Sequence, residues 1–197
     1  MQSIEIGRLL RSGTTGFVAG CNVSQLEAPV FGGLVRAPLG NGYQVYGLIY
    51  DIHIDDDGLV RQLVTVGNVS EEVIADNRER RIVPVEMSVL TVGYELDGKV
   101  AHLLPPRPPL SLDVIYKCDA EDLIRFTAAG RFGYFRHILR AKDAPVGEML
   151  AAHVQQAAQA HKKDADWQNR AIKEIITLLR DDYPTLMSVL GALGETV

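Results

Sequence analysis

The sequence lacks the features that would place it in a membrane or in an oxidising compartment. No segment reaches the roughly 18 uninterrupted apolar residues that a membrane-spanning helix requires, and the N-terminus has no basic start followed by an apolar run. Only two cysteines are present, Cys21 and Cys118. They lie far apart and outside any CxxC spacing, which favours reduced structural thiols. We therefore expect a cytoplasmic protein with no membrane partner.

The chain also lacks a strong charge imbalance. It carries 20 Lys and Arg against 25 Asp and Glu, a formal net charge of −5 at pH 7. Bulk charge therefore draws it neither to nucleic acid nor to an anionic membrane. Of its 197 residues, 47% are hydrophobic, which is typical of a soluble globular protein with one ordinary domain or two small ones.

Sequence signatures of enzymes and metal sites are missing as well. The histidines show no HExxH or short paired spacing, neither cysteine has a neighbour suited to zinc, and no serine lies in GxSxG. The cluster Asp55–Asp57 lacks the ligand spacing of a calcium loop, so a solvated turn is favoured over a metal site. We therefore predict that the chain is not an enzyme and holds no metal or cofactor.

One segment, Gly93 to Lys99, matches the GxxxxGK pattern of phosphate-binding loops. Val100 stands where such a loop needs a hydroxyl to hold magnesium. A phosphate loop also joins a strand to a helix, whereas the dipeptide Asp97-Gly98 is typical of a turn between two strands. The hairpin interpretation is therefore favoured.

What the N-terminal half does contain is a series of β-branched and aromatic runs separated by turns. The longest run, residues 43–54, is apolar on both faces, so we expect it to be a central strand of a small barrel or sandwich, with Gly47 leaving room for a bend or a crossing chain. The turn at 55–58 predicts a hairpin with a second strand at 59–66. Further strands are expected within 4–10, 15–23, 30–38, 82–96 and 100–104, and a short helix at 70–80.

The pattern changes after four prolines between residues 105 and 109, which cannot donate regular ladder hydrogen bonds. Beyond residue 118 the apolar residues recur with a period near 3.6, which predicts helices. The sequence thus predicts an α+β protein, a small N-terminal β-barrel followed by a C-terminal helical region. Its expected parts are a barrel over 1–104, an extended proline-rich connector over 105–118 and a helical region over 119–197.

Four segments together resemble one known family. They are IGRLLRSGTTGFVAGC (6–21), VYGLIYDI (45–52), LLPPRPPLS (103–111) and CDAEDLIRF (118–126). About residues 3–118 resemble the HAS-barrel domain, the small barrel at the N-terminus of HerA-type DNA-translocating ATPases, which is related to the barrel of rotary ATP synthase subunits. The resemblance implies a non-catalytic barrel that makes subunit or partner contacts on a hexameric ring. We expect no ATPase domain within residues 119–197, because these residues are too few for a RecA-like fold.

The one basic concentration, residues 125–142, is interleaved with aromatic side chains. Single-stranded nucleic-acid binders use this composition, so Arg131, Arg136, Arg140 and Lys142 are candidate nucleic-acid contacts. The favoured alternative is that the aromatic side chains form the core face of a helix and leave the arginines in solvent.

A dense apolar cluster surrounds Pro184 near the C-terminus. It exceeds what one narrow face of a short helix can bury, so Leu186, Met187, Leu190 and Leu193 are a candidate assembly surface. We therefore expect a non-catalytic binding or assembly protein that forms a homo-oligomer or docks on a partner protein, and the resemblance implies a HerA-type ATPase as that partner. The alternative is an accessory protein that binds single-stranded nucleic acid through 125–142.

Overall fold

The computed structural model describes residues 4–24, 29–54, 58, 65, 69–80 and 82–195. The strands are β1 (Ile4–Ser12), β2 (Gly16–Ser24), β3 (Leu34–Gly40), β4 (Tyr43–Ile54), β5 (Ile82–Leu96), β6 (Lys99–Ala101) and β7 (Val114–Lys117). The helices are α2 (Glu71–Arg80), α3 (Ala120–Ala128), α4 (Phe135–Leu139), α5 (Val146–Ala160), α6 (Trp167–Leu178) and α7 (Tyr183–Glu195), with a short 3₁₀ turn, η2 (Gly130–Phe132), between α3 and α4.

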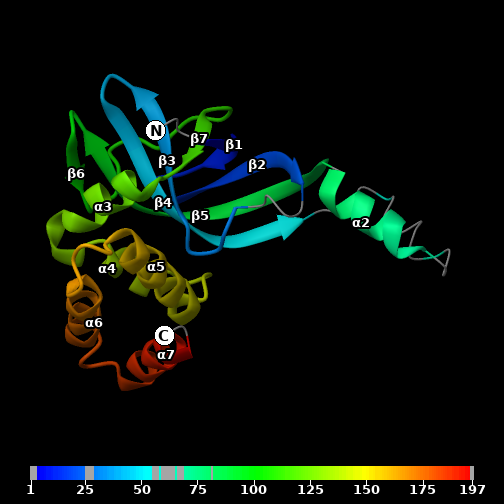
Figure 1. The fold of residues 1–197 in the computed structure, drawn as a ribbon. Coiled ribbons are helices and arrows are strands. Elements are labelled where there is room, and N and C mark those ends of the chain that lie inside the picture. Colours follow the sequence, from blue (N-terminus) through cyan, green and yellow to red (C-terminus); the bar gives the residue numbers. More distant parts are fainter. Residues whose placement is uncertain are drawn as a thin grey trace.

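The strands form one antiparallel sheet that closes into a barrel. Their order is β2-β1-β7-β3-β4-β5-β6, and a further pairing of β2 with β5 closes six of them, while β6 extends β5 outside the ring. The helices after β7 gather on one side of this barrel, and α2 projects from its far end (Figure 1). The predicted α+β architecture, with an N-terminal barrel and a helical C-terminal half, is confirmed. No helix in the described ranges is long and apolar enough to cross a membrane.

Strand β4 is apolar on both faces because each face meets a different core. Val45 and Ile49 belong to a buried cluster to which all six barrel strands contribute, so they face the barrel interior. Tyr46 and Leu48, on the opposite face, are fully buried in a second cluster shared with the C-terminal helices. The two clusters explain why the alternation of period 2, which marks a half-exposed strand, is missing here.

The pairing partners of β4 differ from the predicted hairpin. Among the described residues β4 pairs with β3 on one side and with β5 on the other. Of the strand predicted at 59–66, only Thr65 is described, and it is helical. The rest of that segment and the turn residues 55–57 lie outside the described residues. Strand β5 runs for 15 residues and matches the full length of β4 in antiparallel register, which makes it the larger apolar partner.

The segment predicted as a connector is tied to the barrel. Residues 105–113 form no helix or strand, as expected, but Val114–Lys117 is strand β7, which lies between β1 and β3 and completes the ring. The Tyr43 hydroxyl donates to the Arg107 carbonyl oxygen at 2.9 Å, and the Leu112 amide donates to the Leu9 carbonyl oxygen at 2.8 Å. The first strand after the prolines is therefore part of the barrel.

Two local predictions from turn and cap chemistry are confirmed. Helix α2 begins after Ser70, whose Oγ accepts the Val73 amide at 3.4 Å. The segment that matched a phosphate loop is the β5–β6 hairpin, with Leu96 paired to Lys99 across a turn in which Asp97 and Gly98 both have positive φ. Its backbone amides therefore face a strand rather than the start of a helix.

Candidate functional site

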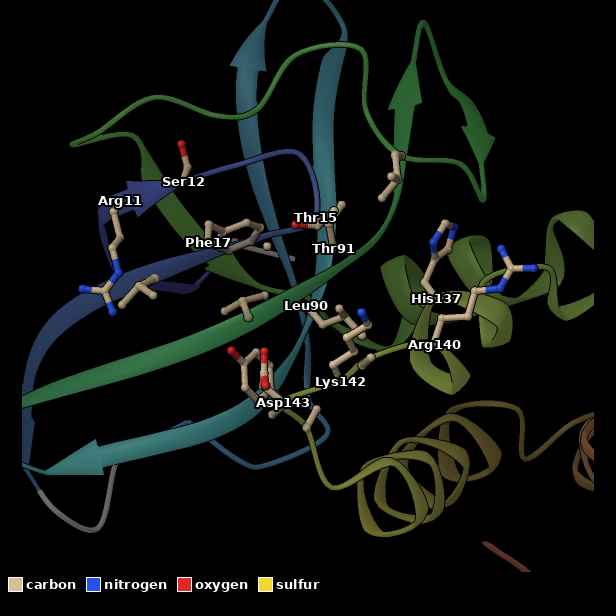
Figure 2. Close-up of a pocket in the computed structure, with 17 residues that line it drawn as sticks. Arg11, Ser12, Thr15, Phe17, Leu90, Thr91, His137, Arg140, Lys142 and Asp143 are labelled. Carbon is tan, nitrogen blue, oxygen red and sulfur yellow. The ribbon is translucent and has the colours of Figure 1, made fainter. Parts of the chain in front are cut away.

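A cleft of about 700 Å³ lies between the barrel and the loop that joins α4 to α5. Its barrel wall comes from the end of β1, the β1–β2 turn, the start of β2 and the middle of β4 and β5. Its other wall is made by α4 and residues 140–144 (Figure 2). We call this feature the cleft.

Both walls of the cleft are anchored by burial and by backbone hydrogen bonds. Phe135 and Ile138 fix α4 in the core with no exposed surface, and the Ala141 amide donates to the Ile138 carbonyl oxygen at 3.0 Å. On the barrel side the Thr91 amide donates to the Thr15 carbonyl oxygen at 3.0 Å. The cleft is therefore built on rigid elements, which suits a preformed binding site.

The rim of the cleft is predominantly cationic. Arg11, Arg140 and Lys142 line it, and Asp143 is the one acidic residue among its lining residues. Arg11 pairs with Glu86 outside the cleft at 3.3 Å. No ion pair within the described residues involves Arg140 or Lys142, and both side chains are exposed. Two unpaired cations therefore stand on the helical wall.

His137 and Thr91 add polar groups to the cleft. The His137 ring lies against the His102 carbonyl oxygen, with Nε2 at 3.2 Å, and burial lowers its pKa, so it is neutral at pH 7. Thr91 is fully buried, lines the cleft and has an Oγ1 without a hydrogen-bond partner among the described residues. Figure 2 shows Thr91 beside Thr15 on the barrel wall.

The four cations predicted to contact nucleic acid are not gathered in one place. Arg140 and Lys142 line the cleft, whereas the Arg136 guanidinium donates to the His102 carbonyl oxygen. Arg131 lines a different cavity, of about 450 Å³, between η2 and α6. Sequence spacing could not separate them, because η2 interrupts the helical period and gives Arg131 a positive φ of 47°.

The aromatic side chains of the same stretch are part of the core. Phe126, Tyr134 and Phe135 have no exposed surface. Phe132 stacks on Phe135 with ring centroids 5.3 Å apart and meets the edge of the Trp167 ring. These rings cannot stack on bases without unfolding the helical core.

The second cavity is lined in part by a hydrogen-bonded pair that the sequence did not reveal. The Thr127 hydroxyl donates to the Leu123 carbonyl oxygen at 2.7 Å, so it accepts from His161 Nε2, also at 2.7 Å. The His161 ring lies flat on Trp167, with centroids 4.7 Å apart. This pair links α3 to the end of α5 and has no free nucleophile, so it holds the helices together rather than supporting catalysis.

A polar network joins α3 to the outer face of the barrel. The Tyr46 hydroxyl donates to Glu95 at 2.7 Å, and Arg125 reaches Tyr46 at 3.0 Å and Asp122 at 2.8 Å. Asp122 also pairs with Arg36 of β3 at 3.2 Å. Burial raises the pKa of Tyr46, and the hydrogen bond to Glu95 raises it further. The network fixes the barrel relative to the helices that carry the cleft.

The predicted C-terminal assembly residues lie at different depths along α7. Leu193 is buried, Leu186 and Leu190 are half-buried against the helical core, and Met187 is 49% exposed. Of the four, Met187 presents the most surface to a partner.

The described residues contain no group of three His, Cys, Asp or Glu side chains that could hold a metal ion. Asp55–Asp57, the one acidic cluster considered from the sequence, lies outside them. Cys21 and Cys118 are both free, and burial raises the pKa of each thiol, so both are poor nucleophiles.

No protein-family model matches the sequence, and no curated protein matches it. Function is therefore argued from the geometry of the cleft.

Proposed function

We propose that the chain is a non-catalytic binding and assembly protein, a HAS-type barrel with a helical appendage that assembles with itself or docks on a ring ATPase of DNA processing. The observation that carries the proposal is the cleft. It is preformed between the barrel and the helices, and it presents the unpaired cations Arg140 and Lys142 beside apolar side chains. A rigid concave surface with a few polar groups is the usual form of a binding site.

The buried histidines His153 and His102 favour binding over chemistry, because three of their four ring nitrogens contact groups inside the fold. His153 lies between the Gly32 carbonyl oxygen and the Tyr134 hydroxyl. His102 contacts the Phe126 carbonyl oxygen at 3.0 Å. Neither imidazole is placed against an exposed hydroxyl or thiol that it could activate.

The test is the mass of the purified chain in solution. We expect light scattering to give more than one chain per particle, or the chain to elute together with a HerA-type ring ATPase when the two are mixed. The mass of a single chain at every concentration, together with no co-elution, would contradict the proposal.

A second candidate function, binding of single-stranded nucleic acid, is favoured by one observation. Arg140 and Lys142 line the same cleft as Arg11, so three cations from two parts of the chain lie along it. Phosphate contacts of this kind give binding that weakens steeply with salt. Binding of an oligothymidylate at low salt, lost in a variant with both Arg140 and Lys142 reversed in charge, would support this function.

A further inference from the structure

The cleft combines a cationic rim with an apolar floor. Arg140 and Lys142 have no ion pair among the described residues and Asp143 is the single lining acid, while Arg11 pairs with Glu86, in a chain whose net charge is −5. This local excess of positive charge steers acidic segments to the cleft and away from the rest of the surface. The first requirement on a ligand is therefore several negative charges.

The floor sets a second requirement. Tyr50 and Leu90, which are half-buried, line the cleft together with Leu104, which is 43% exposed. A ligand that carries charge alone would leave these side chains without apolar partners. One that alternates acidic and apolar side chains can place carboxylates on the rim and apolar groups on the floor.

We infer that the cleft binds an acidic, extended peptide segment with interspersed apolar residues, supplied by the partner protein. This inference rests on the proposed function and names what the partner must present. The carboxylates meet Arg140 and Lys142, and the apolar side chains meet Leu90 and Leu104.

Single-stranded nucleic acid fits the cleft less well. Binding without base readout depends on exposed aromatic faces on which bases stack. The aromatic side chains near the cationic rim, Phe126, Tyr134 and Phe135, have no exposed surface. Within the cleft, Phe17 is buried and Tyr50 is only partly exposed. The cleft therefore offers charge to a nucleic acid but little stacking surface.

The probe is a dye-labelled synthetic peptide in which glutamate and leucine alternate, titrated with the full chain and followed by fluorescence anisotropy. We expect binding that weakens as salt is raised, because rim charges are screened within a Debye length. The double variant Arg140→Glu/Lys142→Glu should weaken binding by about tenfold or more. The matched control is Lys162→Glu/Lys163→Glu, which makes the same change of charge at two exposed lysines outside the cleft and should leave affinity unchanged.

Leu104→Ser provides a variant that keeps the charge of the cleft and changes an apolar side chain that is 43% exposed. It should fold, as judged by circular dichroism, and bind the peptide about threefold or more weakly, because apolar area that the peptide would cover is lost. No binding of the wild-type chain, an equal loss in the lysine control, or unchanged affinity in both cleft variants would overturn the inference. So would an oligothymidylate that binds more tightly than the peptide and depends on the same two cations. If the chain still assembles or co-elutes with the ATPase while the peptide inference fails, the proposed function stands without it.

Discussion

His153 is a fully buried imidazole with a partner for each ring nitrogen. Nδ1 lies 3.3 Å from the Gly32 carbonyl oxygen and Nε2 lies 3.1 Å from the Tyr134 hydroxyl. Burial lowers its pKa from 6.5 to about 4. The ring is therefore neutral at pH 7, with Nδ1–H donating to Gly32 and Nε2 accepting from Tyr134, and it links α5 to α4 and to the chain before β3.

This burial makes stability depend on pH. Above pH 6.5 the ring is neutral in both folded and unfolded chains, so the stabilisation is fully present. As the pH falls from 6.5 toward 4, the unfolded chain binds a proton that the folded chain excludes. The free energy of unfolding should fall across this window by about 3 kcal/mol. Urea titrations at several pH values measure this slope.

The matched variant is His153→Gln, which removes the titrating ring. It should be less stable at pH 7 but lose less stability on acidification, leaving only the contributions of His102, His137 and His161, whose pKa values burial also lowers. Parallel pH profiles for wild type and variant would show that His153 is not the group that responds.

At the scale of elements, β4 bends where its sequence has glycine. The register with β5 shifts between Tyr46 and Gly47, and a Cβ at Gly47 would meet Val89 Cγ1 and come within 2.9 Å of the Leu90 carbonyl oxygen. The space beside Gly47 is therefore taken by Val89 and Leu90 of β5, the neighbouring strand, and both residues line the cleft.

We expect Gly47→Ala to destabilise the chain by about 1–3 kcal/mol, because the added methyl group is forced into packed backbone. Gly191→Ala is the matched control, since Gly191 lies in α7 with no atom within 4 Å of the added Cβ. That change should stabilise by roughly 0.5–1 kcal/mol through helix propensity. Thermal unfolding of both variants tests the pair, and equal shifts in the same direction would contradict the packing account.

Most of the elements could be predicted from sequence, because periodicity and turn chemistry act locally. Strand β5, helix α2 and the Asp97-Gly98 turn follow from such signals. Strand β7 was missed because its four residues, which follow a proline-rich run, are too few to show a period. They form a strand because they pair with β1 on one side and with β3 on the other. The pairing of β4 with β3 and β5 could not be predicted for the same reason, since pairing between distant segments leaves no local signal.

The cleft could be predicted only in part. Arg140 and Lys142 stood out as members of a basic run. Arg11 and Thr91 join them only through the fold, because β1, β5 and the α4–α5 loop are distant in sequence. In the basic run 125–142, the favoured interpretation placed the aromatic side chains in the core. Tyr134 and Phe135 are buried, whereas Arg140 and Lys142 are exposed.

At the scale of the whole molecule, the barrel and the helices share a core. Leu48 of β4 and Val92 of β5 are buried in the same cluster as Phe126 and Leu150 of the helical half. Tyr46 adds a buried hydrogen bond to Glu95 on the same outer face. The outer face of this part of the barrel is therefore an internal surface of the protein.

A barrel fragment of residues 1–118 should consequently be far less stable than the full chain. Removing the helices exposes Tyr46, Leu48 and Val92, and each large apolar side chain returned to water costs about 1.5–3 kcal/mol. Such a loss is comparable to the whole stability of a small domain. We expect the fragment to aggregate or to unfold without a cooperative transition in circular dichroism.

Adding Leu48→Ser and Val92→Thr should recover a soluble, folded barrel if exposure of this face is the cause. A fragment that unfolds cooperatively at the temperature of the full chain would instead show that the barrel is an independent domain, and that the helices only carry the second wall of the cleft.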